Sequence, residues 1–261
     1  MHARSALFDV YGDHLASRGH RAPVSGLVRL LATLGIAAPA VRTAISRMVS
    51  QGWLEPDTVD GARGYAATPQ AVRRLAETAD RVYRRRHESW DGSWQLVALA
   101  PFDSRATRTS VQRDLAFLGY AELSERVWLS PFMRSELDEV LVRAGVRATT
   151  ATARDFDPAD APLRAWDLGA LATAYDEWLR QSADTVARDL AHHDDPEEAA
   201  FAARFHLVHE WRKFLFRDPG LPDELLPAEW PGRAAATYFR QEAARLAPAS
   251  GAFLERTLST A

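Results

Sequence analysis

The sequence predicts an α+β protein made of three consecutive parts, at residues 1–88, 89–156 and 157–261. Three observations lead to this prediction. Apolar residues recur at helical spacing in the first part, short apolar runs alternate with helical segments in the second, and long amphipathic segments fill the third. The chain has 261 residues and no cysteine, so its core must form without disulfides, and its length is sufficient for that.

Charge is distributed unevenly along the chain. The formal net charge is −3, but residues 1–87 hold 13 Arg against 7 Asp and Glu, whereas the remainder holds 19 basic against 28 acidic residues. A basic first third on an acidic body suggests a local site for a polyanion, with chance patchiness as the alternative. No apolar stretch is long enough to span a bilayer and the N-terminus lacks the apolar core of a secretory signal, so we expect a cytoplasmic protein.

The first part is expected to contain helices at 4–15, 24–34 and 40–51, with a loop at 17–23 that carries Arg18, His20 and Arg21. The apolar side of the third helix consists of Val41, Ile45, Met48 and Val49. Its polar side consists of Arg42, Thr43, Ser46, Arg47 and Ser50, and includes no acid. Arginine can bond guanine in a bidentate manner, and Thr and Ser can bond bases or phosphates, so this side suits the major groove of DNA.

A β-hairpin is expected directly after that helix. Trp53 and Leu54 begin an extended segment, Asp60-Gly61 is a strong turn signal, and Arg63 lies near the tip. Two helices followed by such a hairpin predict a winged helix-turn-helix domain. The candidate DNA-binding residues are therefore Arg21, Arg42, Thr43, Ser46, Arg47 and Arg63. A further helix, capped by Thr68-Pro69, is expected to end in three arginines at 84–86, which suit the negative end of the helix dipole.

The middle part reads as a ferredoxin-like domain. Strands are expected at 94–100, 120–123, 126–129 and 146–152, and helices at 104–118 and 134–144. This gives the order βαββαβ, which is the split βαβ arrangement.

The last part is expected to be helical at 164–191, 196–215 and 233–245, with a proline-rich loop at 217–231. It holds no glycine-rich phosphate loop and no recognisable catalytic motif. In the cluster of His206, His209 and Glu210, the two imidazoles share a helix face and could meet one metal ion, but no third ligand is assigned. Histidines on an aromatic-rich helix are more often hydrogen-bonded core residues. We therefore expect no metal site, and we interpret residues 192–195 as a solvated loop.

Four stretches carry a resemblance to a known family. They are ALFDVYGD at 6–13, AVRTAISRMVSQGWL at 40–54, WDGSWQLV at 90–97, and RFHLVHEWRKFLFRDPGLPDELLPAEWPG at 204–232. With these stretches the chain resembles the PaaX family of bacterial transcriptional repressors, which control phenylacetic acid catabolism. The resemblance covers nearly the whole chain.

The resemblance implies a winged-helix N-terminal domain, a middle domain similar to the CRISPR-associated Cas2 fold, and a helical C-terminal domain. It also implies a homodimer that binds a double-stranded, palindromic operator and leaves it on binding phenylacetyl-CoA or a related acyl-CoA. The expected protein is thus a regulator without a cofactor, and not an enzyme.

An acyl-CoA effector requires arginines beside an aromatic pocket. The segment 206–217 supplies this mixture, so the candidate effector-binding residues are Trp211, Arg212, Lys213 and Arg217, next to Phe214 and Phe216. The alternative is that Trp211 belongs to the core and that Arg217 pairs with Asp218 to anchor the proline-rich loop.

Two other functions remain open at this point. One is a nucleic-acid-binding assembly protein without a small effector. The other is an enzyme on the same scaffold, such as a Cas2-like nuclease or a thioesterase. Cas2-like nucleases carry an acid at the start of the first strand, but here that strand begins Trp94-Gln95-Leu96, and Asp103 lies past its end. This speaks against a nuclease.

Overall fold

The computed structural model describes residues 1–83 and 89–259 and divides the chain into two compact units. The first unit contains residues 1–86, 176–212 and 233–261, and the second contains residues 87–175 and 213–232. The first unit thus joins the N-terminal residues with most of the C-terminal helices. The domain boundaries expected at residues 88 and 156 stay predictions.

The three helices expected near the N-terminus are present. They are α1 (Ala3–Asp9), α2 (Val24–Thr33) and α3 (Ala38–Ser50). The first expected helix differs in its second half, because residues Val10–His14 form a π-helical turn. The expected loop 17–23 also differs, since it contains a 3-10 turn (Ala16–Arg18) and a strand, β1 (Arg21–Pro23). Such a short strand has no periodic pattern of its own, and it forms because a partner strand distant in sequence pairs with it.

The expected hairpin is confirmed and forms a three-stranded antiparallel sheet with β1. The hairpin strands are β2 (Leu54–Val59) and β3 (Ala62–Ala67), and the sheet order is β1-β3-β2. Asp60 and Gly61 both have positive φ, 52° and 80°, as the tight two-residue turn requires. Gly64 is required on β3 because a Cβ there would lie 2.6 Å from the Ala22 carbonyl oxygen.

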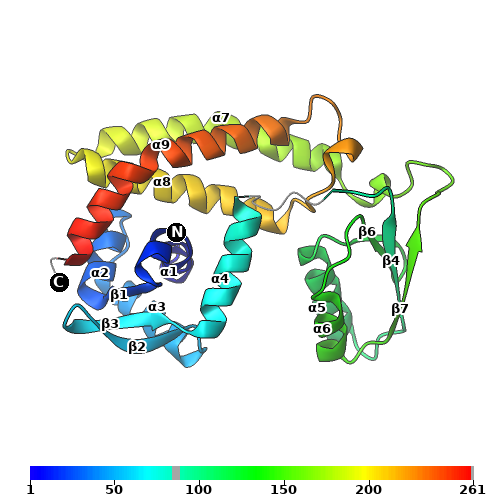
Figure 1. Cartoon of the computed structure of the whole chain (residues 1–261), viewed down its shortest axis with the longest axis horizontal. Coiled ribbons are helices and arrows are strands. Elements are labelled where there is room, and N and C mark those ends of the chain that lie inside the picture. The colour runs from blue at the N-terminus through cyan, green and yellow to red at the C-terminus, as the bar shows by residue number, and fades with distance from the viewer. Residues whose placement is uncertain (84–88, 260–261) are drawn as a thin grey trace. The chain divides into compact units, whose positions relative to one another are not determined.

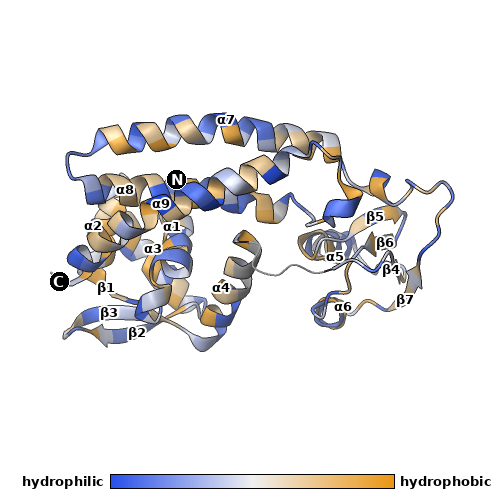
Figure 2. Cartoon of the chain, turned by 45° about the horizontal axis from the view of Figure 1, so that its top comes forward, coloured by the Kyte–Doolittle hydropathy of each residue, from blue (hydrophilic) through white to orange (hydrophobic). Residues whose placement is uncertain are grey.

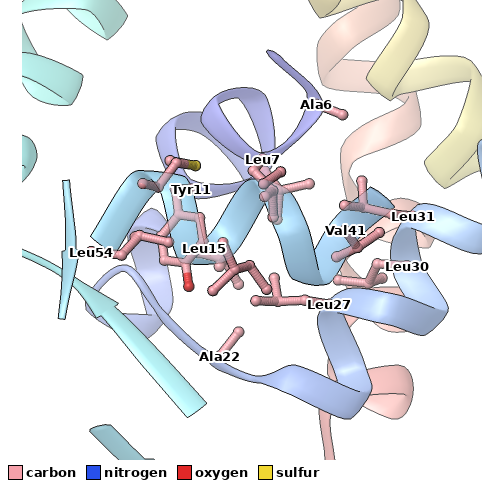
Figure 3. Packing of buried hydrophobic residues seen from close by; sticks show 14 of the residues in the cluster. Ala6, Leu7, Tyr11, Leu15, Ala22, Leu27, Leu30, Leu31, Val41 and Leu54 are labelled. Carbon is pink, nitrogen blue, oxygen red and sulfur yellow. The ribbon is translucent and has the colours of Figure 1, made fainter. Parts of the chain in front are cut away.

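Helix α4 (Pro69–Val82) follows the hairpin and begins where the sequence predicts. The hydroxyl oxygen of Thr68 accepts a hydrogen bond from the Ala71 amide at 3.3 Å, which caps the helix. The expected continuation to residue 86, with its three arginines at 84–86, lies outside the described residues. The core beneath these elements is shown in Figure 3, where side chains of α1, α2 and α3 converge. Its fully buried members include Leu7, Tyr11, Leu15, Leu27, Leu30, Leu31 and Val41.

The second unit has the predicted βαββαβ order. Its elements are β4 (Trp94–Leu99), α5 (Arg105–Phe117), β5 (Ala121–Ser124), β6 (Val127–Ser130), α6 (Leu137–Ala144) and β7 (Ala148–Ala153). The sheet order is β5-β6-β4-β7, and all neighbouring strands are antiparallel. Figure 1 shows α5 and α6 on one face of this sheet. On β4, Val97 and Leu99 pack under the helices and Trp94 is also buried, while Ala98 is exposed.

Three long helices make up most of the last third. They are α7 (Leu168–His192), α8 (Pro196–Trp211) and α9 (Pro231–Ser259), with 3-10 turns at Leu163–Ala165, Arg212–Phe216 and Asp223–Leu225. Figure 2 shows hydrophilic and hydrophobic residues alternating along α7, as expected for a helix that buries one side.

Two helix boundaries differ from expectation. The first helix was expected from residue 164, but α7 begins at Leu168, because Trp166 is extended and the Asp167 carboxylate accepts the Ala170 amide at 2.8 Å. The second was expected to reach residue 215, but α8 ends at Trp211 and continues only as a 3-10 turn.

The expected end of the last helix near residue 245 is wrong. Helix α9 runs on to Ser259 with Pro248 inside it. An internal proline costs a helix about 3 kcal/mol. The residues beyond it offset this cost, because Phe253, Leu254 and Leu258 are buried in the same core as α1 and α2.

Candidate nucleic-acid interface

Helix α3 presents the polar side that the sequence predicts. Pro39 lies in its first turn, where a missing amide proton costs nothing. Val41, Ala44, Ile45 and Met48 are buried and fix the rotation of the helix. The exposed side consists of Arg42, Thr43, Ser46, Arg47 and Ser50. The structure therefore brings all four candidate DNA-contact residues of this helix to one solvent-facing surface.

The two arginines of this surface keep their charge available. Among the side chains that the structure describes, no carboxylate forms an ion pair with Arg42 or Arg47. An unpaired guanidinium on a helix that carries no acid is ready to bind a phosphate or a guanine edge.

The two candidate arginines of the three-stranded sheet, Arg63 and Arg21, have different partners. Arg63 on β3 is exposed, and its guanidinium donates to the Tyr65 hydroxyl at 3.2 Å. Arg21 on β1 binds the Asp57 carboxylate of β2, with Nε 2.9 Å from Oδ2, and these bonds lower the pKa of Asp57. Arg21 is therefore partly neutralised, whereas Arg63 retains its full charge beside the hairpin turn.

A buried ion-pair cluster lies behind this surface, between α1 and the end of α8. Asp9 is almost fully buried, at 4% exposure. Its Oδ2 lies 2.6 Å from His209 Nδ1, and its Oδ1 lies 2.8 Å from Arg212 Nη1. Arg212 also donates to the Ser5 hydroxyl at 2.8 Å. The cluster thus joins α1 to α8, and removing one of its members would leave a buried charge without compensation.

A second cluster lies one helical turn further along the chain. Asp13 binds Arg204 and accepts a hydrogen bond from the Tyr83 hydroxyl. Burial alone would raise the pKa of Asp13, but the neighbouring His14 and the Arg204 guanidinium outweigh it, so the pKa is lowered. Burial lowers the pKa of His14 to about 4, so this imidazole is neutral at pH 7.

These clusters were not anticipated from the sequence, although it contains a signal for them. Asp9 and Asp13 are four residues apart in the mainly apolar stretch 6–13, and Arg204, His209 and Arg212 fall on a segment rich in aromatic residues. Acids and bases in two apolar segments indicate buried pairing, but only the fold shows which partners meet. The two sequence stretches 6–13 and 204–232 thus contact each other through Asp9.

The candidate effector residues are divided between the two units. Trp211 is buried at 3% exposure, its indole donates to the Val82 carbonyl at 2.9 Å, and it stacks on Phe239. Arg212 lies in the same unit and binds Asp9. Lys213 and Arg217 are exposed residues of the second unit, and the Phe216 side chain lies outside the described part. The assignment of these four residues to an effector stays a prediction.

The histidines weighed as metal ligands have carboxylate partners instead. His206 Nδ1 lies 2.7 Å from Asp189 Oδ2, and His209 bonds Asp9, so the two rings serve different partners. Among the described side chains, no three His, Asp or Glu residues gather as a metal site. In the expected solvated loop 192–195, Asp195 accepts the Glu197 amide at 2.9 Å and so caps α8.

Two acids lie near the first strand of the second unit, one exposed and one held by hydrogen bonds and an ion pair. Asp103 is exposed past the end of β4. Asp91, which the sequence reasoning did not consider as a candidate acid, lies three residues before β4. Its carboxylate accepts the Ser93 amide at 2.9 Å and pairs with Arg154. The bonds from Asp91 to Ser93, two residues further on, are those of an Asx turn before the strand.

Comparisons with known proteins cover almost the whole chain. Residues 2–71 match the family described as PaaX-like protein, residues 87–162 the PaaX protein central Cas2-like domain, and residues 166–256 the PaaX-like protein C-terminal domain. The transcriptional repressor PaaX of Escherichia coli (strain K12) is 29% identical over 261 aligned residues, which cover 96% of this chain and 82% of the relative.

A solved structure is also similar. An uncharacterized protein, Rv0674 from Mycobacterium tuberculosis, has 27% sequence identity and a TM-score of 0.63, with 98% of each chain covered.

Within the described residues, no helix is both long and apolar enough to cross a membrane. The three family matches follow one another along the chain in the same order as its predicted parts, and they place a Cas2-like domain in the middle. The chain belongs to the PaaX family.

Proposed function

We propose that this chain is a sequence-specific DNA-binding transcriptional repressor and not an enzyme. In this proposal the N-terminal helices and hairpin form a winged helix-turn-helix module. Helix α3 enters the major groove, and Arg63 and Arg21 approach the backbone or the minor groove from the hairpin side. The observation that carries the proposal is the exposed side of α3, which presents Arg42 and Arg47 without an acidic partner among the described residues.

The repressor acts as a homodimer in the cytoplasm on a palindromic double-stranded operator. A single module of this kind buries little DNA surface, and two-fold symmetry lets two recognition helices read two half-sites. The acidic remainder of the chain supplies the dimer contact, because it would repel DNA if it faced the phosphates.

Release from DNA is controlled by phenylacetyl-CoA or a related acyl-CoA, and no other cofactor is required. Arg212, Lys213 and Arg217 are the candidate partners for the anionic CoA groups. The name of the Escherichia coli relative supports repression, and the effector follows from the family resemblance.

A gel-shift experiment tests this proposal. The probe is the DNA upstream of the protein's own operon, and the added compounds are a panel of acyl-CoA thioesters. We expect a specific complex that one thioester dissociates. A complex that no thioester affects would favour a DNA-binding assembly protein without an effector, and the absence of any specific complex would refute the repressor function.

A further inference from the structure

A small cavity lies inside the first unit, where α1, α4 and α8 meet. Its volume is about 100 Å³. Its apolar lining consists of Phe8, Trp53, Leu75, Ala79, Val82 and Val208. An enclosed apolar cavity of about 150 Å³ binds benzene. This cavity, at about 100 Å³, is open on one side, so it suits a short alkyl group or a ring that enters partway, and it is far too small for a nucleotide.

Two arginines lie at the polar part of this cavity. The Arg74 guanidinium lies 5.5 Å from the centre of the Trp53 ring, and Arg212 lines the cavity beside Asp9. The acids that also line it are already compensated, Asp9 by His209 and Arg212, and Asp13 by Arg204. Because Arg212 already balances Asp9, Arg74 is the basic group that the cavity offers to a ligand. The site therefore suits a ligand with an apolar end and an anionic remainder.

The backbone at this cavity is unusual. The π-helical turn Val10–His14 contributes Gly12 and Asp13 to the lining. Single π turns are rare and occur frequently at functional sites. A Cβ on Gly12 would lie 3.2 Å from Leu75 Cδ2, inside ordinary contact distance, so glycine preserves the space.

The cavity is also linked mechanically to the DNA-facing helix. Trp53, whose ring lines it, connects α3 to β2. The Trp53 amide donates to the Met48 carbonyl near the end of α3 at 2.9 Å, and its carbonyl accepts the Thr68 amide at the start of α4 at 3.1 Å. A ligand that displaces the Trp53 ring would therefore also shift the Trp53 backbone, which is hydrogen-bonded to the end of α3.

We propose that this cavity binds the apolar acyl group of the acyl-CoA effector, with the anionic remainder directed to Arg74 at its edge. The inference rests on the proposed function and specifies where its effector binds. The bound acyl group favours a position of Trp53 that differs from the one required for DNA binding, since a ligand shifts only the equilibrium that it binds differentially. Effector binding and operator binding then disfavour each other, because they require different positions of Trp53 at the end of α3.

Calorimetry with phenylacetyl-CoA and with free CoA tests the proposal. The key variant is Ala79→Leu, which fills the cavity. The control is Ala76→Leu, which adds the same side chain at an exposed position of the same helix. We expect the wild type and Ala76→Leu to bind phenylacetyl-CoA about tenfold or more tightly than free CoA, because the phenyl ring is buried. Ala79→Leu is expected to bind the two compounds about equally.

Melting temperature and operator binding without ligand verify that Ala79→Leu is folded, and phenylacetyl-CoA should no longer release this variant from DNA. If Ala79→Leu keeps the preference for phenylacetyl-CoA and its release, the inference is overturned while the proposed function stands. If the wild type itself shows no preference over free CoA, the inference and the effector half of the proposed function both fail, while DNA binding is judged separately by the gel shift.

Discussion

Arg42 and Arg47 direct their charge into solvent, while other arginines of the same unit are occupied by carboxylates. Arg21 binds Asp57, Arg204 binds Asp13 and Arg212 binds Asp9. A charge that is already compensated contributes less to binding a polyanion than one that is free. The DNA affinity is therefore expected to depend most on the two arginines of α3.

Arg42→Ala and Arg47→Ala are each expected to weaken operator binding by about 1–3 kcal/mol if the residue reads a base. A loss limited to the operator indicates base readout, whereas an equal loss on all sequences with a shallower salt dependence indicates phosphate contact. Titration of labelled DNA at several salt concentrations measures both. Arg188→Ala on α7 is the control and should bind like the wild type; wild-type affinity in both α3 variants would remove α3 from the interface.

His14 makes the stability of the first unit depend on pH. Its pKa falls from about 6.5 in an unfolded chain to about 4 in the folded protein, owing to burial between Phe201 and Phe205. The charged groups facing it are Asp13 and Arg204. Between these two pKa values the unfolded chain binds the extra proton, so stability is complete above pH 6.5 and declines as the pH falls toward 4.

The expected loss from this one histidine is up to about 3 kcal/mol of unfolding free energy. Denaturant unfolding at pH 7.5 and pH 4.5 measures it, and His14→Phe should show a smaller difference between the two values than the wild type. His192→Gln, at the exposed end of α7, is the control with the wild-type difference. Equal pH dependence in His14→Phe and the wild type would contradict the assignment.

At the scale of elements, sequence periodicity predicts most of the helices and strands because each depends on local spacing. The apolar positions of α3 and the Asp60-Gly61 turn are of this kind. The misjudged features depend on distant partners. Pro248 suggests a helix end, but burial of Leu258 in the core of the first unit keeps α9 helical, and β1 exists only because β3 pairs with it.

The same distinction between local and distant partners applies to the candidate site. The exposed side of α3 could be predicted because the residues belong to one helix. The clusters around Asp9 and Asp13 could not, since each of them joins residues about 200 or 190 positions apart. Periodicity identifies which positions are buried, and pairing between segments decides which partners they meet.

The end of α9 should contribute strongly to the stability of the N-terminal helices. Leu258 is fully buried, and its neighbour Thr257 accepts a hydrogen bond from Arg29 of α2. Leu258→Ala is expected to lower the free energy of unfolding by about 2–5 kcal/mol, because it leaves a cavity. Ser259→Ala, at an exposed position, should stay within about 0.5 kcal/mol of the wild type. Denaturant unfolding compares them, and a loss in Leu258→Ala no larger than in Ser259→Ala would show that the end of α9 does not pack as described.

At the scale of the whole molecule, the proposal requires two copies of the chain on one operator. Sedimentation at micromolar concentration is expected to give twice the mass of one chain, both alone and with operator DNA. A clean monomer under both conditions would contradict the proposed mode of binding. Since the chain has an acidic remainder outside its first third, the dimer contact should lie there.

The central claim is that α3 lies in the major groove of the operator, and the absence of cysteine allows a direct measurement of it. Ser50→Cys places a single thiol at the exposed end of α3, to which an iron chelate that cleaves nearby DNA can be attached. Ala187→Cys, exposed on α7, is the matched control. We predict that the Ser50 conjugate cuts the operator at two positions separated by one helical turn or a multiple of it, and that the Ala187 conjugate does not. Cleavage from Ala187 and none from Ser50, with both conjugates bound to the operator, would contradict the claim.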